Sequence, residues 1–220
     1  DTMDCLFLSK TPLFKDMTAE EIKESLEFMN GYEKRFTKSE IILHAGDKTD
    51  SLCLVLSGSV NIKMNNSRGD SNIIGFVGQG QLFAEAYSVV RQKSLLCDAE
   101  AAADTTVLFL QTDKLLSADR YPGSFCIKLI KNMLMISAEK NLALSSRMTH
   151  TAPRLIRDRL VSYLSEQSAA ASCKTFKIPF SRQQLADYLS VERSALSNEL
   201  SKMKRDGLID YNKNNFCLYF

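Results

Sequence analysis

The fold is decided by residues 180–209, which read FSRQQLADYLSVERSALSNELSKMKRDGLI. Their spacing predicts two short helices joined by a tight turn. Ser181 is a suitable N-cap for the first helix, expected at about 182–189. The second helix is expected at about 193–206, and Gly207 ends it. The residues that helical spacing sends into a shared core are Leu185, Leu189, Leu196, Leu200 and Met203.

Two strand-like runs follow the second helix, at 208–211 and 216–220. Two helices at this separation form a helix-turn-helix, and a strand pair directly behind them forms a wing. The sequence therefore predicts a winged helix-turn-helix at the C-terminal end.

The outer, N-terminal side of the second helix carries side chains that match the edges of DNA bases. Arg193 can pair with guanine in a bidentate fork, Asn198 with adenine, and Ser194 with a base or a phosphate. The basic residues farther along the helix are placed to meet phosphates. The set predicted to contact DNA is Ser181, Arg182, Gln183, Arg193, Ser194, Ser197, Asn198, Lys202 and Lys204, with Arg205 beside them. The alternative is a helical hairpin with a solvated polar face, but the caps, turn, wing and charge together favour DNA binding.

Charge is distributed unevenly along the chain. From Thr151 to Phe220 there are 11 Lys and Arg against 7 Asp and Glu, whereas residues 1–150 hold 17 against 19. A basic C-terminal part favours a polyanionic partner. The 220 residues suffice for two domains, and 45% hydrophobic and 25% charged residues are typical of a soluble globular protein. Because we find neither a bilayer-spanning apolar stretch nor a signal-peptide pattern, we expect a cytoplasmic protein without a membrane partner.

The region between residues 32 and 111 consists of short apolar or alternating runs, separated by glycines and polar clusters. Strands are expected at 40–43, 51–56, 59–64, 72–77 and 105–110. Many short strands with regular turns predict an antiparallel sandwich or barrel-like roll. A short helix is expected before them at 18–30, where Thr18 and Glu21 are spaced as a capping box.

A long helix is expected from about 123 to about 145, with apolar residues on two faces. Such a helix fits a dimer seam against a second chain or the core of a monomer, and periodicity alone leaves both open. The polar stretch 145–150 predicts a hinge. Thr151 is expected to cap a new helix that contains Pro153 and ends near Glu166, followed by a loop at 168–174. In the dimer alternative one stripe packs against the roll and carries Phe125, Leu129 and Ile136. The other forms the seam and carries Ile130, Met133, Leu134, Ser137, Asn141 and Leu144.

These segments resemble the Crp/Fnr family of bacterial transcription regulators over nearly the whole chain. The run IILHAGDKTDSLCLVLSGSVNI at 41–62 looks like the family's opening strands, and GQGQLFAEAYS at 78–88 looks like the loop and short helix beside its effector pocket. The resemblance implies an α+β fold. It comprises a cyclic-nucleotide-binding-like β-roll at 1–120, a dimerisation helix at 121–148 and a winged helix-turn-helix at 149–220.

The resemblance also resolves the dimer question, because it implies a homodimer that binds a palindromic operator in double-stranded DNA. RNA polymerase is a further partner to consider. Arg193 would be the principal base-reading residue. Ser194 stands where many members have glutamate and Asn198 where many have arginine, so we expect a half-site other than the family's best-known one. The sensor and the hinge would place the two recognition helices one DNA turn apart, roughly 34 Å.

The expected effector pocket comprises Phe83, Ala84, Glu85, Leu95 and Leu96. Family members that bind cyclic AMP use a glycine–glutamate pair and an arginine–serine pair. Here these pairs fall on Ala84–Glu85 and on Leu95–Leu96, and leucines cannot hold a phosphate. We therefore expect a small effector other than cyclic AMP, and the alternative is an interior filled by its own side chains.

The six cysteines are Cys5, Cys53, Cys97, Cys126, Cys173 and Cys217. They are far apart, so we expect reduced thiols and neither a zinc site nor an iron–sulfur cluster. A haem- or redox-responsive regulator stays open as an alternative, with His44, His150 or a cysteine as candidate axial ligands of a haem and no cysteine selected by its spacing as a redox sensor. We do not expect an enzyme of the cupin type or another class, since a cupin metal site needs several histidines, this chain has only two, and no catalytic motif is present. The remaining rival is a ligand-binding module that never touches DNA.

Overall fold

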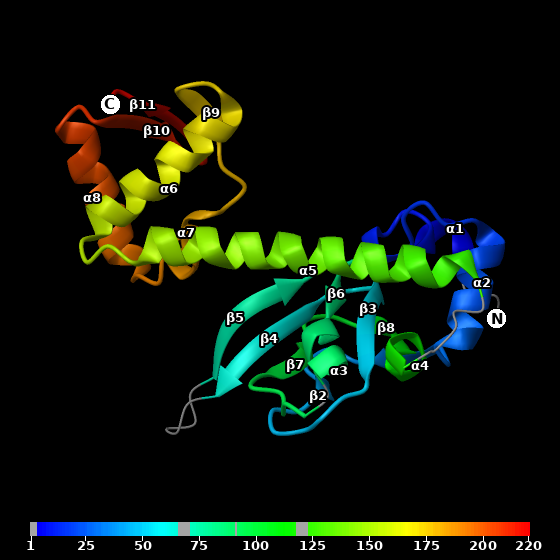
Figure 1. Ribbon diagram of the computed structural model, residues 1–220. Helices are drawn as coiled ribbons and strands as arrows, with labels where there is room; N and C mark the ends of the chain where they lie inside the picture. The colour runs from blue at the N-terminus through cyan, green and yellow to red at the C-terminus, as the bar shows by residue number, and fades with distance from the viewer. Residues whose placement is uncertain (1–3, 66–70, 91, 118–122) are drawn as a thin grey trace. The chain divides into compact units, whose positions relative to one another are not determined.

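The computed structural model describes residues 4–65, 71–90, 92–117 and 123–220 (Figure 1). It forms two compact units, one ending at Ala138 and the other beginning at Glu139, so the division falls within one long helix. The three-part division predicted from the sequence stays a prediction. No helix within the described ranges is both long and apolar enough to cross a membrane.

The N-terminal unit is a β-roll flanked by helices. Its elements are α1 (Cys5–Leu8), η1 (Pro12–Phe14), α2 (Ala19–Phe28), β1 (Tyr32–Phe36), β2 (Ile41–Leu43), β3 (Ser51–Ser57), β4 (Val60–Asn65), β5 (Ser71–Val77), β6 (Leu82–Phe83), α3 (Glu85–Val90), β7 (Asp98–Ala101), β8 (Thr105–Gln111), α4 (Asp113–Ser117) and the first part of α5 (Ser124–Thr151). The strands form two four-stranded sheets in the orders β1-β8-β3-β6 and β2-β7-β4-β5. Every pairing described is antiparallel, which confirms the predicted roll.

The five strands expected from the sequence are present, but the pattern does not predict β1, β6 and β7. The sequence of β1 is YEKRF, and only Phe36 at its end is buried. β6 has two residues, and β7 buries only the small side chains Ala99 and Ala101. Pairing with neighbouring strands rather than residue preference makes these segments extended.

The inner face of α5 completes the core of the N-terminal unit. Phe125, Leu129 and Ile136 are buried there, as predicted. Asn132 lies on the same face, and its amide donates hydrogen bonds to the carbonyls of Leu13 (2.8 Å) and Lys15 (2.9 Å). These bonds satisfy a buried polar side chain and join α5 to η1 and to the residue that follows it.

The predicted hinge at 145–150 is wrong, because α5 continues without interruption to Thr151. Two threonine hydroxyls donate hydrogen bonds to carbonyls of the preceding helical turn. Thr149 donates to Ser145 O (3.2 Å) and Thr151 to Arg147 O (2.8 Å). Polar side chains here are satisfied inside a helix instead of ending it. Pro153 then prevents continuation, and the next helix begins at Ile156 with Leu155 as N-cap, so the predicted cap at Thr151 is also wrong.

The C-terminal unit has a three-helix core and a small sheet. Besides the end of α5, its elements are α6 (Ile156–Ala171), β9 (Thr175–Lys177), α7 (Arg182–Tyr188), α8 (Arg193–Arg205), β10 (Ile209–Asn212) and β11 (Asn215–Leu218). The sheet order is β10-β11-β9. The helix-turn-helix and wing are confirmed, with Ser181 and Gln184 forming a capping box at the start of α7. The predicted loop at 168–174 is wrong at its start, because α6 reaches Ala171 and ends on the left-handed residue Ser172.

Glu21 lies at the centre of a network that joins α2 to α5. Its carboxylate accepts hydrogen bonds from Lys128 Nζ (2.7 Å), Ser124 Oγ (2.7 Å) and the backbone N–H of Thr18 (2.9 Å). These three donors lower the pKa of the Glu21 carboxyl from 4.5 to about 2. The predicted capping box between Thr18 and Glu21 is present as well.

Replacing Glu21 by glutamine tests the network. A carboxyl with a depressed pKa in the folded state stabilises the protein above the unfolded pKa of 4.5, and this contribution is lost as pH falls toward about 2. We expect E21Q to unfold at lower urea concentration at pH 7, with the difference from wild type shrinking steadily below pH 4.5. Glu27→Gln, at an exposed position on the same helix, is the control. A difference for E21Q that does not change with pH would contradict this role.

Candidate nucleic-acid interface

The inner face of α8 sets which side chains face solvent. Leu196, Leu200 and Met203 are fully buried in the core of the C-terminal unit. Because a helix turns 100° per residue, this stripe directs the intervening residues outward. Ser197 is half-buried. The exposed residues of α8 that face outward include Arg193, Ser194, Asn198, Ser201, Lys202, Lys204 and Arg205.

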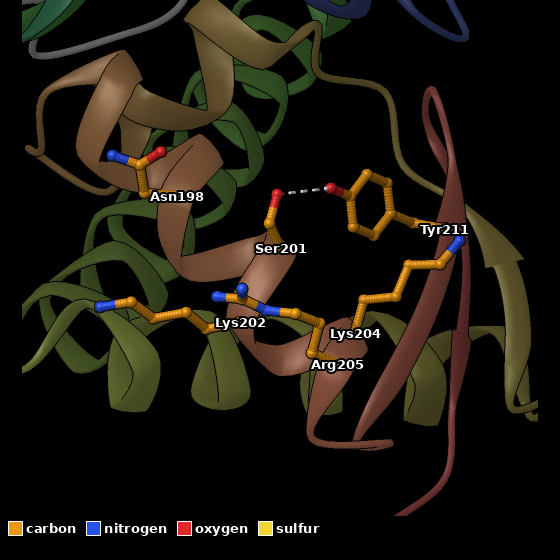
Figure 2. A pocket seen from close by; sticks show the side chains of 6 residues that line it. All are labelled: Asn198, Ser201, Lys202, Lys204, Arg205 and Tyr211. Atoms are coloured by element: carbon orange, nitrogen blue, oxygen red, sulfur yellow. Dashed lines mark hydrogen bonds between the residues drawn. The ribbon is translucent and has the colours of Figure 1, made fainter.

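A groove of about 730 Å³ lies between the outer face of α8 and the wing strand β10. Figure 2 shows Asn198 near one end of the labelled stretch of α8, Lys204 extended toward β10, and Lys202 on the opposite side of the helix. Ser201 Oγ and Tyr211 OH approach to 3.5 Å across the groove. The residues that line it are Asn198, Ser201, Lys202, Lys204, Arg205 and Tyr211. The lining therefore combines hydroxyl and amide groups with three cations, a composition that suits a phosphate backbone.

The three groove cations are not equally available. Lys204 Nζ lies 2.5 Å from Asp210 Oδ1, and this contact raises the pKa of Lys204 and lowers the pKa of Asp210. Lys202 Nζ approaches Glu199 only at 3.9 Å. Within the described part of the chain, Arg193 and Arg205 have no ion pair or side-chain hydrogen bond. Lys202, Arg205 and Arg193 are therefore better placed than Lys204 to meet an anion.

Arg182 is packed against the wing, and its predicted contact with DNA stays a prediction. Its guanidinium lies 5.1 Å from the ring centroid of Tyr211 and 5.8 Å from that of Phe216. Its Nη2 also donates to the carbonyl of Lys213 at 3.4 Å. Burial is the main cause of a lowered pKa of Arg182. The structure thus gives this arginine a role in holding the β10–β11 hairpin against α7, which the sequence pattern does not reveal.

The two neighbours of Arg182 are also engaged locally. Ser181 Oγ accepts from the backbone N–H of Gln184 at 3.3 Å, and Gln183 Nε2 donates to Asp187 Oδ1 at 2.8 Å. Both side chains are exposed, so contact with DNA stays a prediction for them.

The residues expected to form the effector pocket are only partly brought together. Phe83 and Glu85 are buried at the junction of β6 and α3, and Ala84 between them has a φ of +59°. This left-handed conformation costs an alanine about 1 kcal/mol and suits the glycine that the family pattern has there. Leu95 is buried, whereas Leu96 is 72% exposed and lies outside any such pocket. The roll interior near Phe83 is packed with its own side chains, including Phe36 and Phe109.

The histidines offer little to a haem iron. His44 is exposed. His150 is buried, and both of its ring nitrogens are engaged: Nδ1 with Tyr188 OH and Nε2 with Glu166 Oε2, each at 2.9 Å. Within the described residues, no group of three or more His, Cys, Asp and Glu side chains could hold a metal ion. Burial raises the pKa of the Cys53 and Cys126 thiols, which makes both poor nucleophiles.

The outer face of α5 carries an apolar stripe. Leu134 is 68% and Leu144 is 62% exposed, and Ser137 and Asn141 are exposed between them. The sequence assignment needs one correction, because Met133 is only 9% exposed and packs into the core of its own roll. Ile130 also packs against that core, as a half-buried residue. Met133 and Leu134 are 100° apart on the helix, and packing against the roll decides which of them faces inward.

Two domain families match this chain. The cyclic nucleotide-binding domain matches residues 33–119, and the Crp-like helix-turn-helix domain matches residues 158–218. The transcriptional activator protein FnrL of Cereibacter sphaeroides is 23% identical over 190 residues, which cover 81% of this chain and 72% of FnrL. The CRP-like protein Clp of Xanthomonas campestris is 23% identical over 199 residues, covering 86% of this chain and 85% of Clp.

Solved structures show the same fold. The c-di-GMP responsive global regulator CLP of Xanthomonas campestris has a TM-score of 0.61 at 18% identity, covering 92% of this chain and 100% of that chain. CprK complexed with OCPA has a TM-score of 0.65 at 16% identity, covering 91% of this chain and 92% of that chain.

Changing Arg182 to alanine tests its structural role. The variant loses the stacking on Tyr211 and Phe216, an interaction worth about 0.5–2 kcal/mol, and the hydrogen bond to Lys213. We expect the hairpin to open more often, so tryptic cleavage after Lys213 should be about threefold or more faster. Arg182→Lys keeps the charge without the planar group, so its cleavage rate should lie between those of the wild type and Arg182→Ala. Equal cleavage rates in all three proteins would show that Arg182 does not hold the wing.

Proposed function

Because the chain belongs to the Crp/Fnr family of DNA-binding transcription regulators, we propose that it acts as a homodimer whose two α8 helices bind a palindromic operator. The observation that carries the proposal is the exposed polar N-terminal half of α8, backed by a fully buried apolar stripe. A helix held in this way can enter the major groove without losing its place in the core. A protein with this role works beside the chromosome, so we place it in the cytoplasm.

In this proposal, α8 divides its contacts between bases and phosphates. Arg193 donates to the O6 and N7 of a guanine, and Ser194 and Asn198 contact neighbouring base edges. Lys202 and Arg205 in the groove beside Tyr211 bind the phosphate backbone. Serine and asparagine at these positions favour a half-site other than the best-known one of the family.

The proposed partner for the outer stripe of α5 is the same helix of a second copy of this chain. Positions 134, 141 and 148 are seven residues apart, as are 137 and 144, which is the spacing of a coiled-coil seam. Leu134, Leu144 and Met148 are all largely exposed in the single chain. Large apolar side chains spaced in this way favour burial in an interface over contact with water.

We further propose that the roll responds to a small effector other than cyclic AMP. The buried Glu85 follows an alanine that keeps a left-handed backbone, so the turn of the family pattern is present without its glycine. The exposed Leu96 and the buried Leu95 occupy the positions at which a phosphate would need cationic and hydroxyl partners. The aromatic packing around Phe83 favours an apolar ligand if that packing opens.

Replacing Arg193 by alanine tests the reading of DNA. Selection from random duplexes should give a palindrome with the wild-type protein. Arg193→Ala should lose about 1–3 kcal/mol of discrimination, a factor of roughly 10 to 100, at one base pair of each half-site. Arg205→Ala is the matched control, expected to weaken binding to all sequences and to reduce the salt slope by about 1. An unchanged site preference in Arg193→Ala would exclude it as a base-reading residue.

Charge introduced into the α5 stripe tests the dimer. The double variant Leu134→Glu, Leu144→Glu places four carboxylates in a proposed apolar seam, and we expect a monomer at micromolar concentration by sedimentation. Leu6→Glu is the control, because Leu6 is 69% exposed on α1, away from the stripe. A double variant that sediments like the wild-type dimer would place the subunit contact elsewhere.

A further inference from the structure

The last turn of α5 contacts the end of α7, the first helix of the helix-turn-helix (Figure 1). Arg147 Nε donates to the carbonyl of Tyr188 at 3.0 Å, and its Nη2 donates to the carbonyl of Asp187 at 2.9 Å. The guanidinium also lies 5.6 Å from the ring centroid of Tyr188. The final carbonyls of a helix lack partners within it and carry the negative end of its dipole. Arg147 adds two donors and a positive charge at this end, where the Asp187 carbonyl also accepts from the backbone N–H of Ser190 at 3.2 Å.

One turn farther along α5, His150 contacts the side chain of the same tyrosine. His150 is 1% exposed, and its Nδ1 lies 2.9 Å from Tyr188 OH. Its Nε2 lies 2.9 Å from Glu166 on α6, and its ring packs edge-on against Tyr163. A neutral ring satisfies both contacts, with Tyr188 donating to Nδ1 and Nε2–H donating to Glu166. Tyr188 is thus held by α5 through its carbonyl and its hydroxyl.

A second arginine continues the same series of carbonyls. Arg159 on α6 donates from Nη1 to Leu189 O at 2.9 Å and to Ser190 O at 3.3 Å. Its Nε donates to Pro153 O at 2.7 Å, in the link between α5 and α6. The four consecutive carbonyls 187–190 therefore accept hydrogen bonds from two arginines, one on each helix that precedes the helix-turn-helix. The link between α5 and α6 is therefore bonded to one of these arginines.

These contacts lie close to the residues that read DNA in the proposed function. Ser190 has a left-handed backbone, with φ +55°, and Arg193 opens α8 three residues later. We infer that Arg147 is a positioning residue for DNA recognition: together with His150 it makes the last turn of α5 part of the rigid body that presents α8. A shift of the end of α5 then passes directly to the recognition helix. The effect on DNA recognition rests on the proposed function, whereas the fixing of this turn by Arg147 does not.

Amide hydrogen exchange on the full-length protein tests the contact without DNA. Arg147→Ala removes both arginine hydrogen bonds to the carbonyls of Asp187 and Tyr188, so exchange over residues 187–191 should become about tenfold faster. Tyr188→Phe removes only the hydroxyl partner of His150 and should give a smaller increase. Arg154→Ala, at an exposed arginine in the adjoining link, should leave the rates unchanged. Wild-type rates over 187–191 in both Arg147→Ala and Tyr188→Phe would overturn the inference.

A second readout separates positioning from general stability. In a selection that varies both half-site sequence and spacing, wild type should accept a narrow range of spacings. Arg147→Ala should recover the same half-site over a broader range, and Arg147→Lys should restore part of the preference. A variant that keeps the wild-type spacing preference overturns the positioning role. If wild type enriches no duplex, the proposed DNA function fails, and the exchange rates still decide whether Arg147 fixes this turn. If Arg147→Ala does not fold, Tyr188→Phe serves in both measurements.

Discussion

Leu196, Leu200 and Met203 anchor α8 in a core shared with α6, α7 and the wing sheet, and the rest of the C-terminal unit is arranged around that burial. Burying three such side chains contributes on the order of 1.5–3 kcal/mol each, more than any single polar contact on the outer face. Polar contacts refine the position. Arg157 on α6 binds Glu199 of α8 at 2.6 Å and Asp206 at its end at 2.8 Å, which fixes the rotation of α8 about its own axis. The outward direction of Arg193 follows from these two constraints.

The parts of the fold that the sequence predicts are those set by local rules. A capping box and a stripe with helical spacing determine α7 and α8 within thirty residues, so no distant contact is needed to find them. The end of α5 is different. A run of serine and threonine resembles a hinge, but Thr149 and Thr151 bond back to carbonyls of their own helix, and Arg147 gains partners forty residues away. The packing of Arg182 has no sequence signal for the same reason, since its aromatic partners are supplied by the wing. Long-range partners of this kind have no signature in a single sequence.

The β-roll combines a family-like backbone with unfamiliar side chains. Ala84 adopts a conformation that glycine adopts without cost, so the turn into α3 is imposed by its surroundings rather than by the residue itself. Phe83 beside it is buried with Phe36 and Phe109 in the interior of the roll. A pocket in this region would have to displace apolar packing, which favours apolar ligands over phosphates. Sequence reasoning locates this region through Ala84 and Glu85, whereas the outward turn of Leu96 depends on a loop conformation that it cannot predict.

Charge in the C-terminal unit is a poor measure of charge offered to DNA. Several of its cations are held by internal partners, among them Arg147, Arg157, Arg159, Arg182 and Lys204. Each of these side chains stabilises a junction between elements, and each is therefore less available to bind a DNA phosphate. Arg193, Lys202 and Arg205 are better placed to meet DNA, and each phosphate contact adds only about 0.9 to the salt dependence of binding. Binding that uses mainly these three cations depends less on counterion release than the 11 basic against 7 acidic residues of positions 151–220 suggest. Its selectivity then depends on the geometry with which α8 is presented, and therefore on the contacts behind the helix-turn-helix.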